Sequence, residues 1–193
     1  MNKVYLPCQM TKFRGFIAID IPTSQKIVEL SNQIKNSGAN VKLVELKNIH
    51  ITLKFLGDAE EEYIDQIEKT IKESTDGIEP FDIKLANTGV FPNRNYVKVM
   101  WVGIEDNGEL AQISNNINEG LAAFGFEKEK REFSPHLTIA RVRSARNKDK
   151  LVEIVDKYND IEFSTIKVDS IKLMQSELTP KGPIYTTLKE IKL

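Results

Sequence analysis

Cysteine and histidine are scarce in this chain of 193 residues, which has one cysteine, Cys8, and two histidines. A single cysteine excludes an intramolecular disulfide and is typical of a reducing compartment, and we expect Cys8, close to the terminus, to be inert. The sequence lacks an H-E-x-x-H motif and a clustered cysteine pattern, so no transition-metal site is expected. It also lacks a G-x-x-x-x-G-K-[ST] phosphate loop, and we therefore expect neither an ATP site nor another cofactor.

Long apolar runs and a strong net charge are missing as well. Residues 1–10 are too short and too polar for the hydrophobic segment of a signal peptide, and no later run approaches the length of a membrane span. We therefore expect a cytoplasmic protein without membrane contact. The formal net charge of −1 gives no overall attraction to nucleic acid, so any RNA contact must come from a local basic region. No large apolar stripe demands a partner, which favours a monomer.

The sequence does contain one tetrapeptide pattern twice, and each copy begins with one of the two histidines. Residues 50–53 read His-Ile-Thr-Leu, and residues 136–139 read His-Leu-Thr-Ile. Eleven residues of the chain are threonine. A threonine two positions after both histidines would therefore arise by chance with a probability of roughly 0.003. Coincidence is a poor explanation for the repeat.

The spacing of this pattern has a chemical meaning if both copies are strands. Side chains alternate between the two faces of a strand, so His50 and Thr52 share a face, as do His136 and Thr138, while the apolar residues between them point into packing. Each strand then presents one imidazole beside one hydroxyl. Because an imidazole has an ordinary pKa near 6.5, one ring can be held protonated and the other neutral at neutral pH. Two such rings across a cleft can supply a general acid and a general base.

Both halves of the chain predict the same order of strand, helix, strand, helix and strand. The first half comprises a strand over 13–20, a helix opened by Pro22 and ended by Gly38, a strand from His50 to Gly57, a helix from near Asp58, and a strand over 81–90. The second half comprises a strand over 97–104, a helix over 110–121 followed by Gly125, the strand of His136, a helix capped by Asn147, a strand over 163–174, and a last strand over 184–193 after a turn at 181–183.

This repeat predicts an α+β fold of two duplicated β-α-β-α-β lobes. We expect pseudo-two-fold symmetry and antiparallel-rich sheets around a central cleft, with the two histidines meeting at the axis. We expect one bilobal domain over residues 1–193. Lobe one covers approximately 13–91 and lobe two approximately 96–193, with strand exchange between the lobes allowed.

The two tetrapeptides resemble the H-x-T-x signature of the 2H phosphoesterase superfamily. The segments Phe-Ile-Ala-Ile-Asp at 16–20, Asn-Ile-His-Ile-Thr-Leu-Lys-Phe-Leu-Gly at 48–57 and Phe-Ser-Pro-His-Leu-Thr-Ile-Ala-Arg at 133–141 are similar to its RNA 2′,3′-cyclic phosphodiesterase branch, also called 2′-5′ RNA ligase. The similarity extends to residues 91–93 and 182–185. It implies the bilobal duplicated fold and metal-free hydrolysis of an RNA terminal 2′,3′-cyclic phosphate to a 2′-phosphate, with transfer RNA fragments among the RNAs considered.

The resemblance also implies roles for the paired residues. His136 is expected to act as the proton acceptor that activates water, and His50 as the proton donor to the departing 3′ oxygen, although the residues alone leave this polarity open. Thr52 and Thr138 are expected to donate hydrogen bonds to the non-bridging phosphate oxygens, which stabilises charge in the transition state.

Three further residues are candidates for substrate binding. Arg141 follows the second motif, where the family places a phosphate or ribose contact, but strict alternation directs it away from His136, so its participation requires a local bend or the end of the strand. Arg14 and Phe16 occupy alternate positions of the first strand and are expected to line the cleft, with Phe16 stacking a terminal base.

Three other functions compete with hydrolysis of a cyclic phosphate. A metal-dependent hydrolase lacks ligands in this sequence, and a chelator would test it. An RNA-end binding protein without chemistry would not need a matched acid and base. Joining of RNA ends through a 2′-5′ linkage would reverse the same chemistry or use a nucleotide. ADP-ribose cyclic phosphate and a small cyclic nucleotide remain alternative substrates.

Overall fold

The computed structural model describes residues 11–180 and 182–193, so the expectations for Cys8 and for Lys181 in the last turn lie outside the described residues. The elements follow one another as β1 (Lys12–Asp20), α1 (Gln25–Asn36), β2 (Val41–Leu43), the short 3-10 helix η1 (Leu46–Asn48), β3 (His50–Glu60), a second 3-10 helix η2 (Glu61–Tyr63), α2 (Ile64–Ser74), β4 (Phe81–Asn93), β5 (Tyr96–Glu105), α3 (Glu109–Ala122), β6 (His136–Val142), α4 (Lys148–Lys157), β7 (Glu162–Val168), β8 (Ser170–Thr179) and β9 (Gly182–Lys192). The mixed α+β class expected from the sequence is confirmed.

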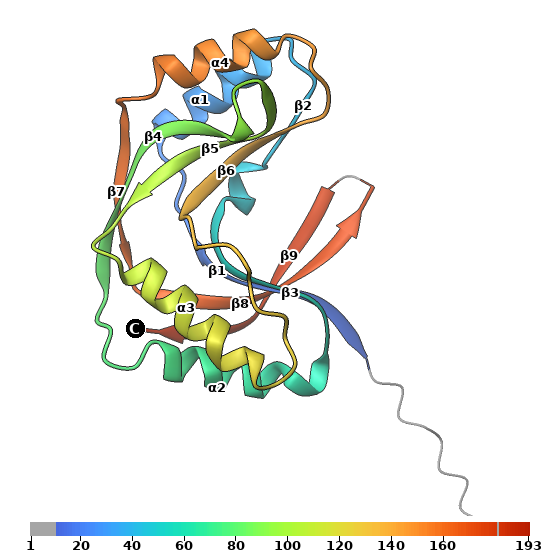
Figure 1. Cartoon of the computed structure of the whole chain (residues 1–193), viewed down its shortest axis with the longest axis vertical. Coiled ribbons are helices and arrows are strands. Elements are labelled where there is room, and N and C mark those ends of the chain that lie inside the picture. Colours follow the sequence, from blue (N-terminus) through green and yellow to red (C-terminus); the bar gives the residue numbers. More distant parts are fainter. Residues whose placement is uncertain (1–10, 181) are drawn as a thin grey trace, which may run out of the picture.

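The strands of the described chain form one curled sheet rather than separate sheets (Figure 1). Their order is β7-β4-β5-β6-β3-β1-β8-β9, with β2 beside β6, and every pairing in the described part of the chain is antiparallel. Strands from the two halves of the sequence are intermingled in this order, because β4 lies between β7 and β5, and β3 and β1 lie between β6 and β8. Strand β4 pairs with β5 and β7, while β8 and β9 extend the sheet from β1.

The helices lie in two pairs at opposite ends of the curled sheet, α1 with α4 and α2 with α3 (Figure 1). Each pair therefore joins one helix from each half of the sequence. The helices bury the apolar stripes that the sequence predicts, and these stripes share one core with the face of the sheet that the helices cover: Ile27, Leu30 and Ile34 of α1, Ile67 and Ile71 of α2, Leu110, Ile113, Ile117 and Leu121 of α3, and Leu151 and Val155 of α4. None of the described helices is both long and apolar enough to span a bilayer.

Several predicted boundaries are wrong, for local reasons. Helix α1 begins at Gln25 rather than beside Pro22, because the Ser24 side chain accepts a hydrogen bond from the Ile27 amide and caps it there. Strand β3 continues past Gly57, since its pairing with β1 runs on to Glu60, and α2 therefore begins only at Ile64.

The expected strand over 163–174 is two strands, β7 and β8, and it breaks at Asp169. The two strands lie toward opposite ends of the sheet, since β7 pairs with β4 whereas β8 pairs with β1. Asn147 precedes α4, but its side-chain amide donates to the Ser37 carbonyl instead of capping the helix. The two glycines expected at helix ends, Gly38 and Gly125, both have left-handed backbone angles.

Candidate active site

The two H-x-T-x segments are neighbouring strands. Ile51 of β3 pairs with Leu137 of β6, and both side chains are fully buried in the core beneath the sheet. Adjacent residues of a strand point to opposite faces, so both histidines and both threonines of the motifs lie on the uncovered face. In this antiparallel register His50 and His136 are diagonal neighbours, a relation that places such side chains about 7–8 Å apart at their origins. The structure thus brings together the four residues that the sequence predicts to act as one site.

Both imidazoles are fixed in the same way by the backbone. The Nδ1–H of His50 donates to the carbonyl oxygen of Asn48 at 2.8 Å, and the Nδ1–H of His136 donates to the carbonyl oxygen of Ser134 at 2.8 Å. A carbonyl oxygen can only accept, so Nδ1 must carry the proton in both rings. The Nε2 atom of each ring is therefore the one available to accept or donate a proton at a substrate.

Aromatic side chains pack against each imidazole. The Phe16 ring centroid lies 4.9 Å from that of His50, and Tyr185 meets His50 edge-on at 5.3 Å. On the other side of the site, Phe91 meets His136 edge-on at 5.0 Å and packs in turn on Trp101 at 5.3 Å. These contacts restrict the rotation of both rings, so the directions of the Nε2 atoms are set before any ligand binds.

A cavity of about 180 Å³ opens beside His50. It is lined by Phe16, Asp20, Lys47, Asn48, His50, Met174, Tyr185 and Thr187. Burial lowers the pKa of His50 below its ordinary 6.5, and the Arg141 charge acts in the same direction, while the Asn48 carbonyl and the Asp20 carboxylate partly offset the shift. Burial also raises the pKa of Tyr185, so its phenol stays protonated at neutral pH.

Arg141 reaches the same face as the histidines through a β-bulge. Trp101 of β5 pairs with Thr138 and Met100 pairs with Ala140, so Ile139 is an extra residue in β6. The extra residue changes the phase of alternation: Ile139 and Ala140 are both buried, and Arg141 is exposed on the side of Thr138. This bulge supplies the local bend that the sequence argument required. The positive charge of Arg141 adds to the lowering of the His50 pKa by burial, and it opposes the rise that burial causes in the pKa of Tyr185.

Arg14 and Phe16 share the face of the histidines along β1, but they differ in exposure. Phe16 is only 4% exposed, packed between His50 and Tyr185, and forms a small apolar cluster with Ala18 and Met174 that is separate from the main core. Arg14 is exposed farther along the strand. The structure therefore places Phe16 as a support for the His50 ring.

The sequence argument missed Asp20, although alternation along β1 already places it on the face of Phe16. Asp20 lies opposite His50 in the β1–β3 register, and its carboxylate accepts a hydrogen bond from Lys172 at 2.7 Å. Tyr185 and Phe91 were also missed as site residues. Strand alternation does not connect either one with its histidine, because each comes from another strand, although both lie in the segments 91–93 and 182–185 to which the family similarity extends.

A buried lysine connects the first motif strand, β3, to α3 and to the segment that leads into β6. Lys54 is 2% exposed, and its ammonium donates to Asn118 Oδ1 at 2.7 Å and to the Glu127 carbonyl at 2.8 Å. Burial lowers the pKa of Lys54, and the charges of Glu129 and Glu127 oppose this shift. Asn118 Oδ1 also accepts the Glu129 amide at 3.0 Å. The side chain that follows the first motif therefore anchors the approach to the second.

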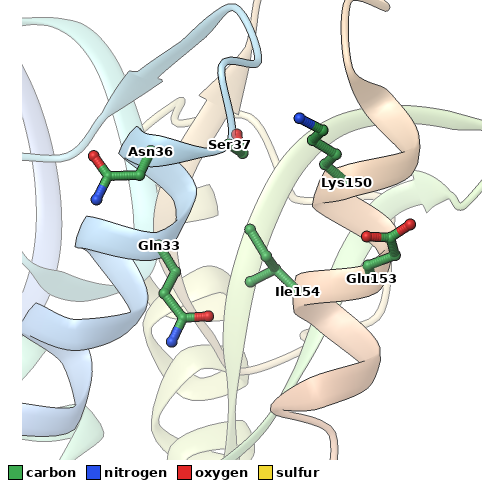
Figure 2. A pocket seen from close by; sticks show the side chains of 6 residues that line it. All are labelled: Gln33, Asn36, Ser37, Lys150, Glu153 and Ile154. Carbon is green, nitrogen blue, oxygen red and sulfur yellow. The ribbon is translucent and has the colours of Figure 1, made fainter.

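A second hollow, of about 310 Å³, lies between α1 and α4 and contains none of the motif residues (Figure 2). Gln33, Asn36, Ser37, Lys150, Glu153 and Ile154 line it. Its location between two helices separates it from the site on the sheet. Over residues 11–180 and 182–193, no group of three or more histidine, cysteine, aspartate or glutamate side chains is arranged to hold a metal ion.

The chain belongs to the 2′-5′ RNA ligase superfamily, whose sequence model matches residues 15–179. The family resemblance drawn from the two motifs is thereby confirmed. An RNA 2′,3′-cyclic phosphodiesterase of Methanocaldococcus jannaschii is 45% identical over 179 residues, which cover 92% of this chain and 99% of that protein. Another, from Methanothermobacter thermautotrophicus, is 36% identical over 184 residues, covering 94% of this chain and 100% of that protein.

Solved structures share the fold along nearly the whole chain. TT0787 of Thermus thermophilus superimposes with a TM-score of 0.76 at 26% identity, covering 93% of this chain and 97% of that one. The apo form of LigT from E. coli gives a TM-score of 0.69 at 22% identity, covering 95% of this chain and 98% of that one. LigT has also been crystallised in complex with 3′-AMP. The expected fold class thus agrees both with the described sheet and with its structural relatives.

Proposed function

We propose that this chain hydrolyses the terminal 2′,3′-cyclic phosphate of RNA to a 2′-phosphate. The observation that carries the proposal is the pair of imidazoles on one open face, each with Nδ1 bound to a backbone carbonyl and Nε2 available to a substrate. Relatives of nearly the same length are named for the same reaction. A matched acid and base is what the opening of a cyclic phosphodiester requires.

In the proposed reaction, His136 Nε2 accepts a proton from water while the water oxygen bonds to phosphorus. The bond between phosphorus and the ribose 3′ oxygen breaks, and His50 Nε2 donates a proton to that oxygen. The product keeps the phosphate on the 2′ oxygen. His136 then carries the proton taken from water, while the proton of His50 is on the 3′ oxygen, and exchange with solvent restores both rings. The imidazoles need to flank the phosphorus, and their diagonal placement across β3 and β6 supports this.

Thr52 and Thr138 are proposed to donate hydrogen bonds to the two non-bridging phosphate oxygens, since each shares the face of its histidine. Arg141 is proposed to bind the phosphate or the ribose, because the bulge directs it to this face. Arg14 is proposed to contact the RNA from the exposed end of β1. Phe16 is proposed to support the His50 ring and the first base of the substrate.

Joining of RNA ends through a 2′-5′ linkage is the second candidate, and the name of the matched family favours it. In that reaction the 5′ hydroxyl of a second RNA would replace water: its oxygen bonds to phosphorus as His136 accepts its proton, the bond to the 3′ oxygen breaks, and His50 protonates that oxygen. The same proposal includes transfer RNA fragments as substrates, catalysis without a metal, a monomeric state and a cytoplasmic location.

The test uses purified full-length protein and an oligonucleotide with a 2′,3′-cyclic phosphate end. We expect a 2′-phosphate product, undiminished after dialysis against a strong chelator. His50→Ala and His136→Ala should each lower turnover by about 10²–10⁴-fold, the usual contribution of general acid–base catalysis. Their melting temperatures should match those of wild type and of the control Lys69→Ala on the exposed side of α2. Wild-type turnover in either histidine variant would remove the site assignment.

A further inference from the structure

The proposed reaction places two different groups on the two sides of the open face. In an in-line displacement, the attacking oxygen and the departing oxygen lie on opposite sides of phosphorus. The attacking group therefore lies beside His136 of β6, and the departing 3′ oxygen lies beside His50 of β3. Water needs no surface beyond His136. In joining, the 5′ oxygen of a second RNA bonds to phosphorus as its proton passes to His136, and the 3′ oxygen leaves with the proton of His50. This second strand must then extend over β6 and its neighbours, β5 and β2.

The strands on the side of His136 carry cations on the open face. Lys42 of β2 lies opposite Arg141 of β6, and cross-strand partners share a face of the sheet (Figure 1). Arg143 follows two positions after Arg141, and the buried Val142 between them faces the core, so Arg143 also points away from the core. Lys42, Arg141 and Arg143 are all exposed. Three cations therefore lie together beyond His136 along β6.

Strand β5 adds a lysine and a tyrosine to this face. Val97 is buried in the core, so Tyr96 and Lys98 on either side of it point to the open face. The Lys98 ammonium lies 4.5 Å from the centre of the Tyr96 ring, which places the two side chains on one side of the strand. Tyr96 is 59% exposed. We call Lys42, Tyr96, Lys98 and Arg143 the basic patch; Arg141 lies between it and the histidines.

The charge of the basic patch is not neutralised by the protein. In the described part of the chain, none of its three cations forms an ion pair with a carboxylate. Beside His50, by contrast, Lys172 is paired with Asp20, and Lys47 is paired with Glu45. The chain has a net charge of −1, so a local group of this kind is what an RNA contact requires.

The basic patch lies several nucleotides away from the reacting phosphorus. Gly103 of β5 lies opposite His136, and Lys98 and Tyr96 are five and seven positions from Gly103 in the sequence. At about 3.3 Å per residue, they are roughly 16 and 23 Å from His136 along the strand. A nucleotide advances a helical strand by about 3.4 Å along its axis. An attacking strand therefore reaches the basic patch only if it contains several nucleotides.

We propose that the basic patch binds the RNA strand that attacks through its 5′ hydroxyl in 2′-5′ joining; this rests on the proposed function and, within it, on the joining reaction. Lys42, Lys98 and Arg143 contact backbone phosphates of this strand, and Tyr96 stacks one of its bases without selecting a sequence. Hydrolysis needs none of these contacts, because water occupies only the space beside His136. Cations around a single ring suit a nucleic acid strand better than a protein, which would need a contiguous apolar patch.

The experiment measures hydrolysis and joining side by side, with purified full-length protein and an oligonucleotide that ends in a 2′,3′-cyclic phosphate. The attacking strand is a 5′-hydroxyl dinucleotide or a 5′-hydroxyl octanucleotide, of which only the octanucleotide reaches the basic patch. We expect wild type to join the octanucleotide more efficiently. Replacement of both Lys42 and Lys98 by glutamine should lower kcat/KM for octanucleotide joining, through KM, by about fivefold for each lysine at about 0.1 M salt. It should also make the dependence of log kcat/KM on log salt shallower by about 0.7 for each lysine. Hydrolysis and dinucleotide joining should stay within about twofold of wild type, since neither uses the basic patch.

Lys69→Gln on the exposed side of α2 is the matched control and should change neither reaction. Lys98→Arg keeps the charge and should join the octanucleotide as wild type does. Tyr96→Leu should weaken octanucleotide joining without loss of a charge, so it tests the patch independently if the double variant lowers the melting temperature.

Three outcomes would overturn the role of the basic patch while leaving hydrolysis intact: a wild type that hydrolyses the cyclic end but joins neither strand, a wild type without preference for the octanucleotide, or unchanged octanucleotide joining in the double variant. Equal losses of hydrolysis and joining in the double variant would overturn it as well. A wild type inactive on the cyclic end would instead overturn the proposed function itself.

Discussion

Replacement of Lys54 by methionine should destabilise the protein far more than the same change at the surface. The Lys54 ammonium makes two hydrogen bonds, at 2.7 and 2.8 Å, in a place where the residue is 2% exposed. Hydrogen bonds to a charged group contribute about 1.5–3 kcal/mol each. After the substitution, Asn118 Oδ1 still accepts a hydrogen bond from the Glu129 amide. Removal of the buried charge also removes its desolvation penalty, which offsets part of the lost hydrogen-bond energy. We therefore expect the free energy of unfolding to fall by about 2–4 kcal/mol.

The assay is equilibrium unfolding in urea, with the slope of the transition compared between variants to confirm that the same surface is exposed. Methionine retains the length of the lysine stem, so the measured loss reports the polar contacts and not a cavity. Lys72→Met is the control, because Lys72 forms its ion pair with Glu68 on the exposed surface of α2 and should cost less than about 1 kcal/mol. A Lys54→Met protein as stable as the control would refute the reasoning.

Two further predictions concern the chemistry. Thr52→Val and Thr138→Val keep the shape of the side chain and remove its donor, so each should lower kcat by about 10²–10³-fold without a change in melting temperature, as measured by steady-state kinetics and thermal unfolding. If His50 is the proton donor, kcat/KM should fall as pH rises through the pKa of His50, which burial places below 6.5 in the free enzyme. The anionic phosphate raises the pKa of His50 in the complex, so the fall in kcat should occur at a higher pH. A kcat/KM that instead falls as pH drops through this same pKa would assign His50 as the base.

The residues of the two motifs could be placed from the sequence because alternation is a local rule. His50 and Thr52 share a face whatever strand lies beside them, and the helices could be placed for the same reason from their apolar stripes. The orientation of Arg141 could not be placed by strict alternation, since a bulge depends on the register with a neighbouring strand. A signal was nevertheless present, because the apolar positions of β6 change phase between Ile139 and Ala140.

The order of strands in the sheet could not be predicted, because it depends on contacts between distant segments. Residues 163–174 carry apolar side chains interleaved with polar ones, a pattern that local rules join into one strand. The chain breaks at Asp169 because β7 and β8 belong to opposite ends of the sheet. The aromatic neighbours of the histidines arrive from β4 and β9 for the same reason. The approximate ranges of the two lobes stay a prediction.

Within the described residues, the pair of Ile51 and Leu137 is the only ladder contact between the strand group β3-β1-β8-β9 and the group β7-β4-β5-β6. The two imidazoles flank this junction, one contributed by each group. Their separation is therefore governed by how sharply the sheet curves, while each ring keeps its own carbonyl partner at any curvature. Changes in the length of loops far from this pair leave the distance between the two imidazoles unchanged. A change in the side-chain volume of Ile51 or Leu137 instead alters the space between the imidazoles that is available to the phosphate.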